Sequence, residues 1–378
     1  MEFVIIYSII IFSILIISLY LYLFYERAKE KKRNRVIIKN ESVIEQLLDN
    51  IISKIEQQEV NDDEIYALKS LLNDELTAQI LTEKFIHYIE SFRGTFLQSI
   101  INLSEEIGLV DYQIKKLNTR NVNDRILAIK NLGELRSKKG LEPILKMLNS
   151  SNPEQIYSSL KAISNIGDEE YFIKAFNMID ENIILSERSL IEIADSFKGD
   201  KSKVYLELMK SDKDFVSTVF IKSAGNFRDS KLLDEIYKFL NDKNNEKKIA
   251  AVRAFGNIGD NRYLDDIIKL LDSDSWELRA TCAKVLGQIN DKKAIEALVG
   301  LLKDENYYVR RNAANSIIHL DGGLESAKEI LQGDDKFAKD IIINAIETAY
   351  SWNELVEYDK KTSEPKLTKL ITDYIENE

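Results

Sequence analysis

The sequence predicts an all-α protein: a right-handed α-solenoid of about 7–8 helical hairpins, preceded by one N-terminal transmembrane helix. Three observations predict this class. A helical-hairpin pattern recurs between residues 118 and 351. The chain has only 14 Gly and 3 Pro in 378 residues, which favours helix. Residues 3–24 form an uncharged, strongly apolar run.

The apolar run reads FVIIYSIIIFSILIISLYLYLF, and as a helix it spans roughly 33 Å, enough for a hydrocarbon core. We therefore expect a transmembrane anchor over residues 1–25, with contact to the membrane through residues 3–24. No short apolar core with a small-residue cleavage site is present, so a removable signal peptide is not expected. The positive-inside rule predicts a single-pass protein with its N-terminus outside and its repeat domain in the cytoplasm, because cations follow at once: Arg27, Lys29, Lys31, Lys32, Arg33 and Arg35.

Residues 26–40 form a basic juxtamembrane stem, with seven Lys and Arg against Glu26 and Glu30. We interpret the stem as a topology determinant, with recognition of anionic lipid as the alternative. The whole chain carries a net charge of −11, so the part after the stem is acidic. Nucleic-acid affinity comes mainly from Lys and Arg on phosphates, and nucleic acid is therefore not an expected partner.

Residues 41–118 form an N-terminal helical region without the repeat pattern. One apolar stripe lies at helical spacing, and further helices are predicted from Asp62, after the cap Asp74, and over residues 92–107, ending at Gly108. We interpret this region as a cap on the first repeat, because terminal units of a solenoid must cover an open core. The alternative is a coiled-coil seam for self-association through residues 41–118.

Residues 119–351 form the repeat solenoid. Its period is 31 residues, with one step of 30, and eight equivalent positions mark the turn between the two helices of each hairpin: Leu132, Ile163, Ala194, Ala224, Phe255, Leu286, Ile317 and Thr348. Self-similarity at such a period indicates stacked hairpins.

Three further positions repeat in register. Glycines follow the reference position, where we expect a left-handed backbone at the end of the first helix: Gly133, Gly225, Gly256 and Gly287. Oxygen-bearing side chains five residues after it are predicted to cap the second helix: Ser137, Asp168, Asp229, Asp260 and Asp291. Cations seven residues before it are predicted to form a column: Arg125, Lys248, Arg279 and Arg310.

The segments SDSWELRATCAKVLGQINDKKAIEALVGLLKDE and DENYYVRRNAANSIIHL carry a recognisable signature, DxxxxVRxxAxxxLGxxGD followed by AxxxLxxLLxD. In these residues the chain resembles the short HEAT-like repeats of bacteria, of the type seen in phycobilin lyase subunits, and in particular membrane-anchored bacterial proteins of this kind. The resemblance covers the repeat region and implies an architecture. It does not imply one activity, because such solenoids bind many unrelated molecules.

Residues 352–378 are predicted to form a C-terminal helical cap after a polar hinge at residues 360–364. Pro365 is placed as the first helical residue, and an apolar stripe follows at Leu367, Leu370, Ile371, Tyr374 and Ile375. A docking helix for a partner is the alternative interpretation.

The search for catalytic or ligand-binding chemistry gives no candidate. His87 and His319 lie on different elements without partners at metal-ligand spacing, so we predict no metal, no cofactor and no catalytic residue. Cys282 lies between Ala280 and Ala283, and we interpret it as a packing residue.

The candidate partner-binding residues are aromatics and arginines at the starts of two first helices: Trp276, Arg279, Tyr307, Tyr308 and Arg310. An aromatic beside an arginine, repeated at solenoid spacing, is suited to clamp a peptide or an acidic group. The alternative is that the aromatics are hydrophobic staples on the preceding repeat, and that the arginines bond neighbouring turns.

Two function classes follow. We expect a non-enzymatic scaffold or accessory protein, tethered by its N-terminal helix, that binds a protein partner in or at the same membrane. The alternative, which rests on the resemblance alone, is a lyase-like or chaperone activity similar to that of phycobilin lyase subunits.

Overall fold

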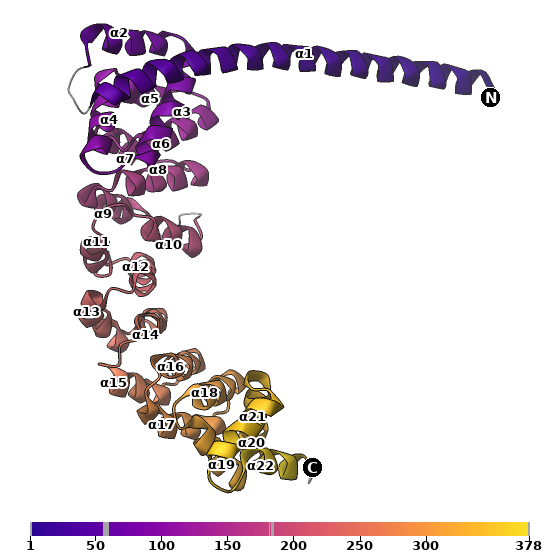
Figure 1. The fold of residues 1–378 in the computed structure, drawn as a ribbon, viewed down its shortest axis with the longest axis vertical. Coiled ribbons are helices and arrows are strands. Elements are labelled where there is room, and N and C mark those ends of the chain that lie inside the picture. Colours follow the sequence, from indigo (N-terminus) through magenta and orange to yellow (C-terminus); the bar gives the residue numbers. More distant parts are fainter. Residues whose placement is uncertain (1, 56–59, 181, 183–184, 377–378) are drawn as a thin grey trace. The chain divides into compact units, whose positions relative to one another are not determined.

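The computed structural model describes residues 2–55, 60–180, 182 and 185–376, but not the side chains of residues 2–12, 30 and 32–36. All regular structure in this part of the chain is helical. The contacts divide the chain into two compact units, Met1–Ile166 and Gly167–Glu378. Figure 1 labels the helices of both units.

The first unit contains eight α-helices: α1 (Glu2–Ile55), α2 (Asp62–Ser70), α3 (Glu75–Ser91), α4 (Gly94–Glu106), α5 (Leu109–Lys116), α6 (Val122–Leu135), α7 (Leu141–Lys146) and α8 (Pro153–Ile166). Helix α2 begins with a capping box between Asn61 and Glu64, and Asp74 caps α3 as predicted. Gly108 has a φ of 81° and separates α4 from α5.

The apolar stripe at the end of α1 packs inside its own unit. Ile44, Leu48 and Ile51 are at most 2% exposed, and this part of α1 contacts α3 and α4. Helices α3 and α5 in turn contact α6, the first helix of the first repeat. The region is therefore a cap on the repeats, and the stripe is not free to form the seam of a coiled coil.

The second unit contains fourteen α-helices: α9 (Glu169–Met178), α10 (Glu187–Asp195), α11 (Lys201–Leu208), α12 (Asp214–Phe227), α13 (Leu233–Tyr237), α14 (Asn245–Ile258), α15 (Leu264–Lys269), α16 (Trp276–Ile289), α17 (Ile295–Gly300), α18 (Tyr307–His319), α19 (Gly323–Gln332), α20 (Lys336–Ala349), α21 (Trp352–Lys361) and α22 (Leu367–Glu376). Several of the short second helices are flanked by 3₁₀ turns, such as Lys292–Ala294 before α17 and Leu301–Lys303 after it.

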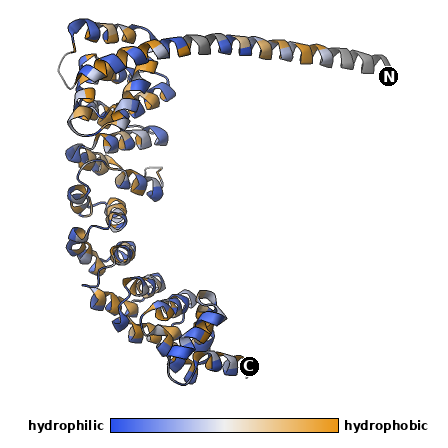
Figure 2. Ribbon diagram, in the orientation of Figure 1, coloured by the Kyte–Doolittle hydropathy of each residue, from blue (hydrophilic) through white to orange (hydrophobic). Residues whose placement is uncertain are grey.

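The hairpins stack in two layers, as the repeat pattern predicts. All eight reference positions fall in the last turn of a first helix, from Leu132 in α6 to Thr348 in α20. In the second unit the first helices α12, α14, α16 and α18 contact one another in order, and the second helices α11, α13, α15 and α17 lie on the other side (Figure 1). Apolar residues of both layers are buried, and the ribbons of both layers carry hydrophobic as well as hydrophilic stretches (Figure 2).

The prediction of a transmembrane helix over residues 3–24 is contradicted. Within the described residues, the structure has no helix that combines the length and the apolarity needed to cross a membrane. Helix α1 does not end after the apolar run but continues without a break through the charged stem to Ile55. The predicted single-pass topology, with the N-terminus outside and the repeats in the cytoplasm, depends on that helix and is contradicted as well.

The explanation of the repeated glycines is also corrected. The left-handed residues lie three positions later than predicted, at Arg136, Arg228, Gly259 and Asn290. The glycines are instead contact points between successive first helices. A Cβ at Gly133 would lie 2.6 Å from the Ala162 Cα, and one at Gly225 would lie 2.7 Å from the Ala254 Cα. The glycines therefore let the backbones of neighbouring repeats approach closely.

The predicted capping residues are confirmed. Ser137, Asp229 and Asp291 each accept a hydrogen bond from the backbone N–H two residues later, at the start of a 3₁₀ turn that leads into the second helix. Asp168 caps α9 through the Tyr171 amide, and Asp260 accepts from the Arg262 amide at 2.9 Å. These bonds satisfy amides that the start of a helix leaves without partners.

The C-terminal segment folds into the helices α21 and α22. Helix α22 packs on α19 and α21, and it buries Leu367 and Ile371 at 0% and 1% exposure. Its stripe is therefore occupied inside the chain and not offered as a docking helix. Pro365 is not the first helical residue, since the helix begins two residues later at Leu367. The side chain of Asp359 caps this start by accepting hydrogen bonds from the Leu367 and Thr368 amides.

Candidate partner-binding groove on the first helices

An aromatic pair marks the start of the candidate site. Trp276 is the first residue of α16, directly after the N-cap Ser275. Tyr308 is the second residue of α18, and its backbone N–H donates to the side chain of the N-cap Asn306. Their rings stack at a centroid distance of 5.7 Å with an interplanar angle of 26°. Trp276 stays 38% exposed and Tyr308 57% exposed. This stacking contact joins Trp276 to the following repeat. The alternative interpretation instead placed the ring as a hydrophobic staple on the preceding repeat.

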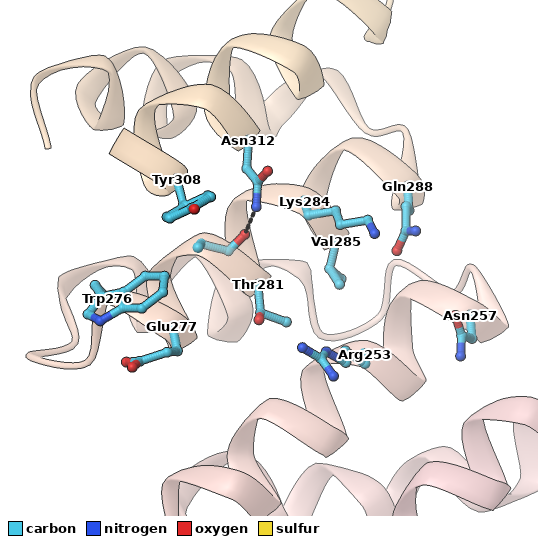
Figure 3. Close-up of a pocket in the computed structure, with 11 residues that line it drawn as sticks. Arg253, Asn257, Trp276, Glu277, Thr281, Lys284, Val285, Gln288, Tyr308 and Asn312 are labelled. Atoms are coloured by element: carbon cyan, nitrogen blue, oxygen red, sulfur yellow. Dashed lines mark hydrogen bonds between the residues drawn. The ribbon is translucent and has the colours of Figure 1, made fainter. Parts of the chain in front are cut away.

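A cavity of about 500 Å³ opens beside this pair across α14, α16 and α18 (Figure 3). It is lined by Arg253, Asn257, Trp276, Glu277, Ala280, Thr281, Lys284, Val285, Gln288, Tyr308 and Asn312. A second cavity, of about 560 Å³, shares three of these residues and is lined by Lys284, Gly287, Gln288, Arg311, Asn312, Asn315, Ser316 and His319. We call the two together the first-helix groove.

Local packing fixes the floor of the groove. The Asn312 amide donates to the Ala280 carbonyl at 2.8 Å, and the Ser316 hydroxyl donates to the Ala283 carbonyl at 2.8 Å. Both bonds run from α18 to α16. Because they tie polar side chains to the neighbouring backbone, the two helices hold one register. The groove is therefore built on rigid elements.

The groove carries three exposed cations from three successive first helices, Arg253 on α14, Lys284 on α16 and Arg311 on α18. Among the described residues, none of these three side chains has an ion pair or a hydrogen-bonding partner. Glu277 is the one carboxylate among the described groove residues, and it accepts from the Ser275 hydroxyl at 2.9 Å beside Trp276. The groove is thus locally basic on a chain with a net charge of −11.

Two of the predicted binding residues have structural roles. The Arg279 guanidinium forms a bidentate pair with Asp304 of the next repeat, at 2.7 and 3.0 Å, and the two side chains are 11% and 7% exposed. It also donates to the Ser273 carbonyl at 2.8 Å. Arg310 donates to the backbone carbonyls of Asp304 and Glu305 at 2.6 and 3.0 Å. Both arginines bond neighbouring turns, as the alternative interpretation predicted.

Tyr307 lies outside the groove. It is 49% exposed and lines a smaller cavity of about 260 Å³ with Arg310, Phe337, Asp340, Ile341 and Asn344. Tyr307 meets Tyr308 at a centroid distance of 5.8 Å, so the exposed aromatics continue from the groove toward α20.

Sequence reasoning missed the cations and amides of the groove. Arg253 and Lys284 are 31 residues apart, each two positions before a reference residue, and Asn257 and Gln288 show the same spacing two positions after it. The repeat alignment contained this signal. The cations at Arg279 and Arg310 repeat with the same regularity, but their side chains are bonded within the chain.

The remaining candidates for chemistry are structural or solvent-facing. Burial raises the pKa of the Cys282 thiol to about 12, and its side chain is fully buried, so it is a packing residue as predicted. Nδ1 of the exposed His319 donates to the Asn315 carbonyl at 2.6 Å. Within the described residues, no group of three His, Cys, Asp or Glu side chains is arranged to hold a metal ion.

Comparison with known protein families supports the assignment of the repeats. Residues 264–349 match the family described as HEAT repeats, and residues 247–273 match the family described as PBS lyase HEAT-like repeat. The chain therefore contains HEAT-like repeats of the phycobilisome-lyase type, and the groove lies almost entirely within the matched residues. No curated protein sequence matches the chain.

Solved structures with a similar backbone fold include an engineered protein. It is 18% identical with a TM-score of 0.35, and the match covers 84% of this chain and 99% of the engineered protein. The karyopherin Kap121p, bound to the extreme C-terminus of the protein phosphatase Cdc14p, is 12% identical with a TM-score of 0.45, covering 83% of this chain and 45% of the karyopherin. The CpcE–CpcF complex of phycocyanin lyase from Nostoc sp. PCC7120 is 15% identical with a TM-score of 0.28, covering 70% and 94%. With TM-scores below 0.5, these similarities carry no conclusion about function.

Proposed function

We propose that this chain is a non-enzymatic scaffold whose HEAT-like repeats bind a segment of a partner protein in the first-helix groove. The observation that carries the proposal is the juxtaposition of a stacked, exposed aromatic pair with three cations that have no described partner. Exposed aromatics and arginines are the residue types that dominate binding energy at protein interfaces.

The architecture supports a polymeric ligand. The groove crosses three successive first helices, and two pairs of its residues repeat at a spacing of 31: the cations Arg253 and Lys284, and the amides Asn257 and Gln288. A solenoid of stacked hairpins commonly provides such an extended surface. A compact metabolite would be enclosed by a deeper, more apolar pocket.

The chemistry of the groove supports binding more than catalysis. Its described polar side chains are mostly cations and amides, with Glu277 as the single carboxylate. The Ser316 hydroxyl and His319 Nδ1 both donate to backbone carbonyls, and Cys282 is fully buried. General acid–base or nucleophilic catalysis needs an activated group with a partner within hydrogen-bonding reach. The lyase-like alternative gains no such observation from the groove.

Site-specific photo-crosslinking tests the proposal. A photo-reactive residue replaces Tyr308 in the groove and, as a matched control, Tyr66 on α2, which is 74% exposed. A protein captured at position 308 alone is identified by mass spectrometry and purified. Its affinity is then measured for the unmodified chain and for Trp276→Ala. A loss of about tenfold or more in the variant is expected, because truncating an aromatic hot spot costs about 2 kcal/mol or more. Equal affinity for both would refute the groove as the binding site.

A further inference from the structure

The three cations of the groove indicate the charge of its ligand. Arg253, Lys284 and Arg311 are exposed, while other cations of the same layer are paired inside the chain, for example Lys222 with Glu187 at 2.6 Å and Lys247 with Asp214 at 2.6 Å. Keeping three unpaired cations together on an acidic chain is electrostatically complementary to an anionic ligand.

Arg253 and Lys284 occupy equivalent positions, two residues before Phe255 and Leu286, so the packing of their first helices sets the distance between these two cations. Arg311 lies six residues before Ile317, about one helical turn away from the equivalent position. Helix axes pack 8–10 Å apart in general, with small residues at the contact giving the shorter distances. Gly256 and Gly287 are such contacts, because a Cβ there would lie 2.5 Å from the Gln288 Oε1 and 2.4 Å from the Ser316 Oγ. The step from one repeat to the next is therefore about 9 Å.

One backbone conformation reproduces this step. A polyproline II helix rises 3.1 Å per residue with three residues per turn, so residues i and i+3 lie on the same side about 9 Å apart. In a β-strand, residues i and i+2 share a side but are only about 7 Å apart. A polyproline II segment thus matches the spacing of Arg253 and Lys284, and aromatic-lined grooves are suited to this conformation.

We infer that the first-helix groove binds an acidic segment in the polyproline II conformation, with two carboxylates three residues apart against Arg253 and Lys284, and an apolar residue against the Trp276–Tyr308 pair. This inference rests on the proposed function and specifies its ligand class. The Glu277 carboxylate lies beside Trp276 and would repel a carboxylate of the ligand at this point. The ligand residue that contacts the Trp276–Tyr308 pair is therefore apolar.

Fluorescence anisotropy with defined probes tests the inference. The first peptide contains about four Glu-Pro-Ala triplets followed by one Phe. The second has the same composition with Glu at alternating positions, the third has Gln in place of Glu, and an oligo-dT strand tests nucleic acid. The first peptide is expected to bind the full chain at least about tenfold more tightly than the others, because it alone matches both charge and spacing.

Charge-reversal variants locate the site. Lys284→Glu combined with Arg311→Glu is expected to weaken the first peptide at least about tenfold. Lys292→Glu combined with Lys293→Glu changes two exposed lysines next to the second helix α17 and is expected to have no effect. Far-UV circular dichroism confirms that both variants are folded. Unchanged binding in the groove variant overturns the inference.

The remaining outcomes separate this inference from the proposed function. Equal binding of the second peptide overturns the spacing, equal binding of the Gln peptide overturns the acidic class, and tighter binding of oligo-dT assigns the groove to nucleic acid. If no peptide binds but the crosslinked partner still depends on Trp276, the inference fails and the proposed function stands. If the partner is insensitive to Trp276 as well, both fail.

Discussion

Gly287 of α16 lies directly against Ser316 of α18, so that a Cβ on Gly287 would be 2.4 Å from the Ser316 Oγ and 2.7 Å from its Cβ. The Ser316 hydroxyl meanwhile donates to the Ala283 carbonyl one turn earlier in α16. The contact therefore combines close backbone packing with a buried hydrogen bond. It sets the spacing of the two helices that carry Lys284 and Arg311.

Gly287→Ala is expected to destabilise the protein by about 1–3 kcal/mol, because the added methyl group must push the two helices apart or break the Ser316 bond. The free energy of unfolding from urea titration measures the effect. Gly300→Ala is the matched control. Gly300 is in the helix α17 with no atom within 4 Å of a Cβ, so alanine there is expected to stabilise by up to about 1 kcal/mol. Equal effects of the two changes would contradict the packing role.

The second prediction concerns the buried pair of Arg279 and Asp304. Arg279→Ala is expected to cost about 3–5 kcal/mol, because it leaves the Asp304 carboxylate, which is 7% exposed, without its bidentate partner. Arg310→Ala removes bonds to backbone carbonyls only and is expected to cost about 1 kcal/mol. Urea unfolding of both variants measures the difference. A cost for Arg279→Ala no larger than that for Arg310→Ala would refute the assigned role of the pair.

The helical repeats, their register and the capping side chains could be predicted from the sequence, because each depends on local chemistry that recurs every 31 residues. The repeated glycines are an example of a feature whose role could not be predicted from the sequence. Gly133 and Gly287 were assigned a backbone role from their place near a helix end, whereas the neighbour that requires glycine, Ala162 or Ser316, is supplied by the next repeat.

The candidate site was predicted in part. Trp276 and Tyr308 were chosen for their equivalent places at the starts of two first helices, and the structure shows that both rings are exposed and stack on each other. Arg279 was chosen because an arginine recurs at the equivalent position of the next repeat. Recurrence alone does not distinguish an arginine that is bonded within the chain from one that is available to a ligand. That distinction depends on Asp304, which lies 25 residues further along the chain.

The third prediction concerns the thiol of Cys282. Burial raises its pKa to about 12, so at pH 8 almost no reactive thiolate is present in the folded protein. We expect a thiol reagent such as DTNB to react at least about 100-fold more slowly with native protein than with protein in denaturing urea. Comparable rates in both conditions would show that the first helix α16 opens readily and would contradict the tight packing at Gly287.

The last prediction concerns pH and the C-terminal cap. Asp359 is 6% exposed, and its carboxylate accepts from the Leu367 and Thr368 amides at 2.8 and 3.0 Å and from the Thr368 hydroxyl at 2.6 Å. Burial opposes its ionisation, but these hydrogen bonds outweigh burial and hold the pKa of Asp359 below its usual range. The folded state therefore binds this proton less readily than the unfolded chain does. The stabilisation is present in full above the unfolded pKa and is lost as pH falls through the lower folded value.

Asp359→Asn is expected to cost about 1–2 kcal/mol at pH 7, because an amide cannot accept three hydrogen bonds as an ionised carboxylate does. The difference in unfolding free energy between the two proteins is expected to shrink below about pH 4, where Asp359 becomes protonated in the unfolded chain. Urea titrations from neutral pH down to acid measure this difference. Asp321→Asn is the control, since Asp321 is exposed and has no described polar partner. A difference for Asp359→Asn that stays constant down to the lowest pH would mean that the helix α22 is held by its buried Leu367 and Ile371 alone.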